Sequence, residues 1–211
     1  MRFLFDPNSK IMLFISRFAD LVVLNLVFLL TCIPVFTIGA ANSALYDTVF
    51  RMDTAREGKL LSTYFRAFRT NFKQSTASWL LLLLFGAATY VNMVQFSAFG
   101  GSFGYLLFLF SMLVLVILLM VFSYSFPLLS QFRNSTIGTI KNALLLSVAH
   151  LPRTAVVLVI NCFPWVLILM NLYAFTKLGF LWFSLYFAAA AYFNSRVLYP
   201  VFLPYMEHDQ K

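Results

Sequence analysis

Long apolar stretches alternate with short polar segments along this chain. Charged residues are absent from residues 21–46, 74–132, 154–176 and 178–195. About 20 apolar residues cross the hydrocarbon core of a bilayer as one helix, and the longest stretch has room for two helices joined by a turn at 100–104. The pattern therefore predicts an all-α, polytopic transmembrane helix bundle in a single membrane domain, 1–211. Its five expected spans are residues 18–37, 77–99, 105–129, 154–176 and 180–199.

The first predicted span contains a helix break. Pro34 removes one backbone hydrogen bond, Thr37 and Gly39 follow it, and Asn42 is suited to cap a new helix. Two arrangements fit this pattern. Residues 18–37 cross the membrane, or residues 18–45 enter and return as a re-entrant hairpin that keeps the N-terminus on the side of the long loops.

Residues 42–76 form the one long polar segment, predicted to be cytoplasmic and amphipathic. Apolar residues recur at helical spacing in each half of it, at Leu45, Val49 and Met52 and then at Leu61, Phe65, Phe68 and Phe72. Arg66, Arg69 and Lys73 fall on the other side of the second half. An aromatic face opposite a basic face is typical of a helix lying at the membrane interface, so Arg66, Arg69, Phe72 and Lys73 are its candidate interface residues.

Composition supports a membrane protein, and the distribution of basic residues predicts its orientation in the membrane. Of 211 residues, 62% are hydrophobic and 10% charged, and the net charge is +8. With five spans, 11 Lys and Arg residues lie on the side of the long loops and 4 on the other. Because cytoplasmic loops retain Lys and Arg, the long loops and the C-terminus are expected on the cytoplasmic side of the membrane, and nucleic acid is not expected as a partner.

Amides are the main polar groups inside the predicted spans. Asn25, Asn92, Asn161 and Asn171 are candidates to line a pocket for a small neutral solute. Interhelical packing is the alternative, since buried amides hydrogen-bond between membrane helices. Amides that pair with each other or face lipid would remove the support for a solute pocket. Pro164 also frees the carbonyl of Ile160, which either faces a cavity or is satisfied by a neighbour.

Chemistry beyond hydrogen bonding has little support in the sequence. Cys32 and Cys162 lie in apolar stretches, and His150 and His208 have no second ligand at metal-binding spacing. No nucleophile–base pair, carboxylate pair or phosphate-binding glycine loop is present. The sequence therefore predicts a protein that is not an enzyme, with no catalytic or metal-binding residues and no cofactor.

Two motifs carry a family resemblance. One runs from Leu24-Asn25-Leu26 through Ile33-Pro34-Val35-Phe36-Thr37-Ile38-Gly39-Ala40-Ala41 to Ala44-Leu45-Tyr46, and the other is Phe65-Arg66-Ala67-Phe68-Arg69-Thr70-Asn71-Phe72-Lys73-Gln74. Together they resemble the YesL family of bacterial integral membrane proteins, a domain of unknown function. The resemblance implies a small polytopic protein, mainly of Gram-positive bacteria, that is often encoded beside carbohydrate uptake transporters. Because no activity is established for that family, the resemblance assigns no catalytic or ligand-binding residue to this chain.

Three functions remain open at this level. The first is a non-enzymatic accessory component associated with bacterial carbohydrate uptake, whose partners are the lipid bilayer and a sugar ABC transporter or its sensor kinase. The second is a membrane protein that binds or transports a small solute. The third is a structural or lipid-interacting protein whose basic helix binds anionic head groups.

Overall fold

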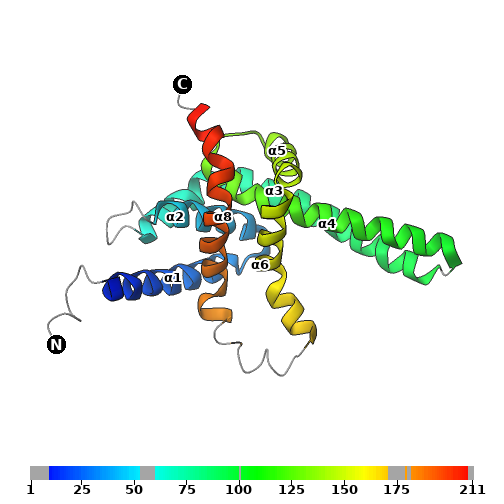
Figure 1. Cartoon of the computed structure of the whole chain (residues 1–211), viewed down its shortest axis with the longest axis horizontal. Helices are drawn as coiled ribbons and strands as arrows, with labels where there is room; N and C mark the ends of the chain where they lie inside the picture. Colours follow the sequence, from blue (N-terminus) through cyan, green and yellow to red (C-terminus); the bar gives the residue numbers. More distant parts are fainter. Residues whose placement is uncertain (1–9, 53–59, 100, 171–178, 180–181, 209–211) are drawn as a thin grey trace.

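The fold is built from helices. A computed structural model of the chain describes residues 10–52, 60–99, 101–170, 179 and 182–208. Almost all of these residues are helical and none is in a strand, so the predicted all-α fold is confirmed. In Figure 1, α1 and a long helical hairpin extend to opposite sides of a central body, while α6 and α8 lie side by side across their direction.

The predicted break at Pro34 is present. Helix α1 (Lys10–Cys32) ends two residues before Pro34, a 3₁₀ turn follows (η2, Val35–Thr37), and α2 (Ile38–Arg51) begins directly after it. The Thr37 hydroxyl lies 2.6 Å from the carbonyl oxygens of both Thr31 and Pro34, so it supplies a donor where the helical bonds are lost. The first helix therefore ends before Thr37, and Asn42 lies inside α2 rather than at its start.

Helix α2 is the most important departure from the predicted amphipathic segment. Ten of its 14 residues, from Gly39 to Val49, are buried, so the first half of 42–76 is a core helix rather than a surface one. Its buried positions include five small residues, Gly39, Ala40, Ala41, Ser43 and Ala44. Small side chains allow neighbouring helices to approach on several faces. The burial was not predicted because the prediction relied on large apolar residues at helical spacing.

The second half of 42–76 and the second predicted span form one helix, α3 (Leu60–Ala98). No break separates them, because nothing between Phe72 and Trp79 interrupts the backbone bonds of a helix. After Phe99 the chain reverses into α4 (Gly101–Gln131), and Gly101 has a φ of 70°, which glycine adopts without strain. The predicted turn at 100–104 is thus shorter than expected.

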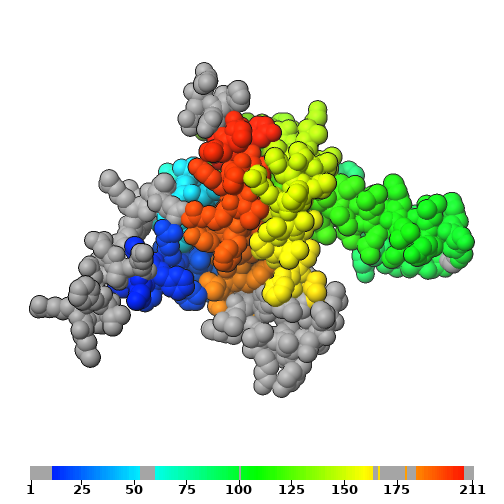
Figure 2. Space-filling model, in the orientation of Figure 1, coloured from blue at the N-terminus to red at the C-terminus, as the bar shows by residue number. Residues whose placement is uncertain are grey.

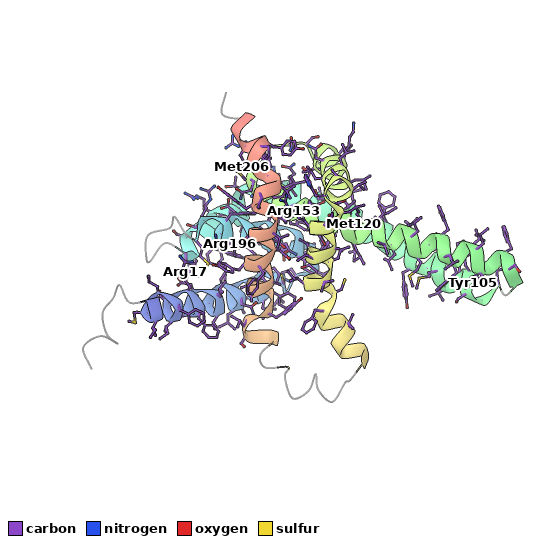
Figure 3. The ribbon with its side chains drawn as sticks, in the orientation of Figure 1. Arg17, Tyr105, Met120, Arg153, Arg196 and Met206 are labelled. Atoms are coloured by element: carbon purple, nitrogen blue, oxygen red, sulfur yellow. The ribbon has the colours of Figure 1, made fainter. Side chains whose placement is uncertain are left out.

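The second half of α3 and the first half of α4 form a hairpin that projects from the body (Figures 1 and 2). Tyr105 lies near its far end and Met120 where it joins the body (Figure 3). Its surface is apolar on several sides; the exposed side chains include Leu84, Phe85, Val91, Leu106, Phe110 and Leu113. Such a surface is expected to face lipid or other apolar helices rather than water.

The rest of the body is formed by α5 (Thr136–Ala149), α6 (Leu151–Met170), a π-helical turn (η3, Trp182–Tyr186) and α8 (Phe187–His208). Ser135 caps α5 by accepting a bond from the Gly138 amide. Helix α8 continues through Pro200 and Pro204, so the helix predicted to end at Pro200 is longer.

Three described helices are long and apolar enough to cross a membrane: α1 from Ile11, α3 and α4. A fourth is obtained if α5 and α6, bent by 108° at His150, count as one broken span. These helices are consistent with a multi-pass membrane protein. The five-span count stays a prediction, since the expected fourth span continues beyond the described residues and the described part of the fifth divides between η3 and α8.

Candidate functional site

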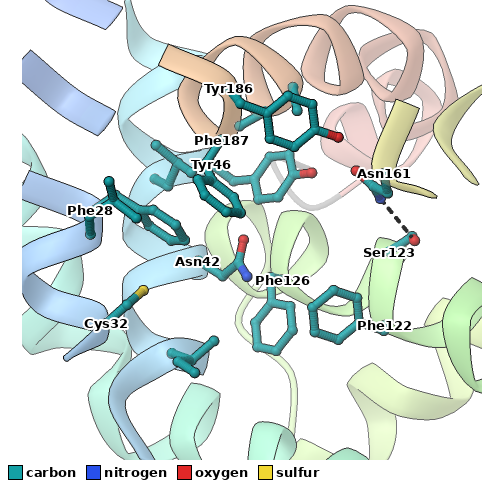
Figure 4. A pocket seen from close by; sticks show the side chains of 15 residues that line it. Phe28, Cys32, Asn42, Tyr46, Phe122, Ser123, Phe126, Asn161, Tyr186 and Phe187 are labelled. Atoms are coloured by element: carbon teal, nitrogen blue, oxygen red, sulfur yellow. Dashed lines mark hydrogen bonds between the residues drawn. The ribbon is translucent and has the colours of Figure 1, made fainter. Parts of the chain in front are cut away.

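A cavity of about 350 Å³ lies at the centre of the body, bounded by α1, α2, α4, α6, η3 and α8. Aromatic and aliphatic side chains form most of its wall, among them Phe28, Leu45, Phe122, Phe126 and Phe187 (Figure 4). Its polar lining groups are Cys32, Asn42, Tyr46, Ser123, Asn161 and Tyr186. A mainly apolar cavity with a few polar groups is the usual form of a small-molecule site.

Asn42 contributes an amide side chain to the lining of this cavity. Its amide lies among the lining side chains in Figure 4, and it makes no hydrogen bond to any described residue. An amide has two donors and an acceptor oxygen, and leaving them unpaired beside an apolar wall is costly. From the sequence alone, Asn42 was expected to act as a helix cap. Its place among the small residues of a buried helix is the signal that could have marked it as a cavity residue.

Asn161 is committed to a network between helices. It donates to the Ser123 hydroxyl at 3.1 Å, and its own carbonyl oxygen accepts a bond from Asn194 at 2.8 Å. Asn194 also donates to the Tyr46 hydroxyl at 3.2 Å. The network therefore joins α2, α4, α6 and α8, which is the packing role that the sequence left as the alternative.

The other predicted lining amides do not converge on the cavity. Asn25 is fully buried and accepts a bond from the Ala188 amide at 2.9 Å, where α8 leaves the π turn. Asn92 lies exposed on the projecting hairpin. Asn171 falls outside the described residues. The pocket predicted from these residues with Asn161 is therefore not formed as expected, because the sequence does not reveal which helices meet.

The carbonyl of Ile160 is satisfied by a neighbour, the second of the two outcomes expected from Pro164. The Tyr186 hydroxyl donates to it from η3. Together with the bond between Asn25 and Ala188, this contact anchors the π turn and the start of α8 to α6 and α1. The two bonds satisfy backbone groups of Ile160 and Ala188 that would otherwise stay unpaired, and they hold one wall of the cavity in place.

The candidate interface residues lie on the first half of α3. Arg66, Arg69 and Lys73 are exposed, as predicted, and Phe72 is partly buried against Phe68 with ring centroids 5.5 Å apart. The buried face of this half contains Tyr64 and Ala67, so it is rotated from the predicted row of Leu61, Phe65, Phe68 and Phe72.

The break residues have separate roles. Pro34 and Thr37 end one helix and start the next, whereas Gly39 allows α2 to lie against α3. A Cβ atom at Gly39 would be 2.3 Å from the Ser75 carbonyl oxygen and 2.6 Å from the Trp79 Cβ. Trp79 also donates from its indole nitrogen to the Val35 carbonyl at 2.8 Å, which fixes η2 to α3.

A second apolar groove, of about 350 Å³, runs along the base of the projecting hairpin. Trp79, Leu83, Gly86 and Tyr90 of α3 line it together with Leu115 and Leu119 of α4. A Cβ atom at Gly86 would meet nothing within 4 Å, so the backbone of α3 is open to the outside at this point. Small residues of this kind are where membrane helices approach each other closely.

Comparison with known proteins finds a match over one part of the fold. A family described as "Protein of unknown function, DUF624" matches residues 21–93, which run from α1 through the break and α2 into the hairpin. The match covers roughly a third of the chain and shows a similarity of that segment. No curated protein and no solved structure matches the chain significantly.

Proposed function

We propose that the chain is a non-enzymatic, multi-pass membrane protein that acts as an accessory component of a bacterial carbohydrate uptake system. In this proposal the groove at Gly86 receives a transmembrane helix of the transporter. The association with carbohydrate uptake rests on the resemblance to the YesL family. In this proposal the hairpin lies in the bilayer of the bacterial cell membrane.

The observation that carries the proposal is the open groove on an apolar hairpin. Lipid-facing helices usually cover their backbone with large side chains, whereas Gly86 and the adjacent Ala87 leave that of α3 accessible between Leu83 and Tyr90. Association of helices in lipid depends on close van der Waals packing, for which a groove with a small residue at its floor is well suited.

Asn92 adds a second reason to expect a protein partner beside the hairpin. Its amide is exposed on an apolar element and has no hydrogen-bond partner among the described residues. Hydrocarbon chains offer an amide no hydrogen bond, whereas a polar side chain on a neighbouring helix does.

The test compares two substitutions on one helix. Gly86→Leu fills the groove, while Ala88→Leu adds a similar side chain two residues away at an exposed position that does not line the groove. Tagged full-length protein is purified in mild detergent from cells grown on an oligosaccharide, and carbohydrate transporter subunits are quantified by mass spectrometry. The proposal expects such subunits with the wild type and Ala88→Leu, and about a tenfold loss or more with Gly86→Leu.

Two results would contradict the proposal. One is abundant tagged protein without any carbohydrate transporter subunit. The other is equal recovery of such subunits with Gly86→Leu and Ala88→Leu. Thermal unfolding of the variants, followed by tryptophan fluorescence, shows whether either substitution has instead damaged the fold.

Asn42 favours a second candidate function, binding of a small solute in the central cavity. The solute would be mainly apolar, because most of the wall is, and would carry one group that hydrogen-bonds to the amide. Asn42→Leu removes that group while retaining much of the side-chain volume. A deletion strain screened across carbon sources, complemented with the wild type or Asn42→Leu, tests the function. Equal complementation by both would count against a role for Asn42.

A further inference from the structure

A cavity of different character lies where α2 and α4 end and α3 begins. It measures about 380 Å³ and is lined by three arginines, Arg51, Arg66 and Arg133. Thr70, Asn71 and Gln74 of α3 and Ser130 and Gln131 of α4 supply further polar groups. Its arginines come from three separate parts of the chain, so no local sequence motif reveals it.

The described lining of this basic cavity carries a net positive charge. Its one acid is Asp47, which is only 5% exposed and accepts bonds from the Arg51 Nε at 3.0 and 3.1 Å. The guanidinium groups of Arg66 and Arg133 form no ion pair with any described residue. Two exposed arginines therefore face a cavity whose single carboxylate is already engaged.

The neutral groups are compatible with an anion. The Thr70 hydroxyl has no hydrogen-bond partner in the described part of the chain. The amide nitrogens of Asn71 and Gln74 are used elsewhere, on the Ser43 hydroxyl at 3.3 Å and on the Asn134 carbonyl. These bonds fix the cavity wall and leave binding to the arginines and Thr70.

We propose that the basic cavity binds a phosphate group, held between Arg66 and Arg133 with Thr70 as an additional donor. A planar guanidinium offers two parallel N–H groups, which match two phosphate oxygens, and Arg66 and Arg133 bring two such groups to one cavity from separate segments. The phosphate belongs either to the head group of an anionic phospholipid or to a soluble phosphate ester. Both present the same oxygens to the arginines.

A matched control separates this site from general attraction to negative charge. Arg69 lies one turn from Arg66 on α3 and is also exposed, but it does not line the cavity. A diffuse basic face loses similar affinity when either arginine is neutralised. A defined site loses affinity with Arg66→Gln and Arg133→Gln and retains it with Arg69→Gln.

The experiment follows thermal unfolding of the full-length protein in a neutral detergent. In one arm, sodium phosphate is titrated against sodium chloride at equal ionic strength. In the other, the micelles contain increasing phosphatidylglycerol, with phosphatidylcholine as the neutral reference. A ligand that binds the folded state raises the unfolding temperature as its concentration rises. Arg66→Gln and Arg133→Gln are each expected to weaken the apparent affinity about tenfold, because each removes a charged hydrogen-bonding partner.

The two arms identify the source of the phosphate. Stabilisation by inorganic phosphate supports a soluble ester, and stabilisation by phosphatidylglycerol alone supports a lipid head group. The proposal is overturned if neither probe stabilises the wild type, or if Arg69→Gln weakens binding as much as Arg66→Gln. Gly86→Leu lies outside the cavity and leaves this response unchanged, so its outcome is separate from that of the accessory function.

Discussion

At the scale of single residues, two glycines with opposite surroundings give opposite expectations. Gly39→Ala forces α2 away from Ser75 and Trp79, and we expect it to lower the free energy of unfolding by about 1–3 kcal/mol. Gly86→Ala meets no atom within 4 Å inside a helix and is expected to raise it by up to about 1 kcal/mol. Denaturant unfolding in detergent measures both. Similar effects from the two substitutions would show that the packing of α2 on α3 is looser than described.

Asp47 is expected to make the stability of the fold depend on pH. Burial raises its pKa above the ordinary value of 3.8, while the charges of Arg51 and Arg66 and the bond from Arg51 partly oppose this. A raised carboxyl pKa means that the folded state holds its proton more tightly than the unfolded state. Asp47 therefore favours folding below about pH 4, and this contribution is lost as pH rises through the raised pKa.

Asp47→Asn should remove this part of the pH profile. The unfolding temperature of the wild type relative to Asp47→Asn is expected to fall as pH rises from about 4 toward neutrality. Arg51→Gln serves as the opposing control, because loss of the arginine raises the pKa of Asp47 further and extends the decline to higher pH. Parallel profiles for the wild type and Asp47→Asn would exclude the effect.

At the scale of helices, the amide network predicts an energetic connection between α6 and α8. Asn161 and Asn194 share a direct hydrogen bond, so Asn161→Ala and Asn194→Ala should be non-additive, with a coupling of about 0.5–2 kcal/mol. Asn92→Ala with Asn194→Ala is the control pair, since Asn92 lies exposed on the hairpin. A double-mutant cycle on unfolding free energy makes the comparison, and equal coupling in both pairs would contradict the network.

The helix break at Pro34 was accessible from the sequence, because it depends on neighbours along the chain, whereas the continuity of α3 past Phe72 and of α8 through Pro200 was not. Pro34 acts within a few residues of its own position. The burial of α2 could not be predicted, because its small side chains are buried only by the helices that pack on them. The same reason applies to the sites. Asn42 and Asn161 meet at one cavity, and Arg66 and Arg133 at another, only after helices far apart in sequence have packed.

At the scale of the whole molecule, the break at Pro34 bears on the direction of the first helix. After η2 the chain reverses, so that the end of α2 lies toward the same end of the molecule as the beginning of α1 (Figure 1). The basic cavity also places the ends of α2 and α4 together. These placements favour the re-entrant alternative, in which the start of α1 shares a membrane side with the long loops. Lys10 and Arg17 of α1 then join the basic residues of those loops, which increases the charge bias across the membrane.

Cysteine labelling distinguishes the two topologies. In a background with Cys32→Ala and Cys162→Ala, single cysteines replace the exposed residues Ile11 on α1, Arg69 on α3 and Ile137 on α5. A membrane-impermeant maleimide is applied to sealed vesicles of known orientation. The reversal at Pro34 predicts that Ile11→Cys, Arg69→Cys and Ile137→Cys react from the same side. Five independent spans place Ile11→Cys on the side opposite the other two. Labelling of Ile11→Cys alone from the outside would therefore contradict the re-entrant arrangement and show that residues 18–37 cross the membrane.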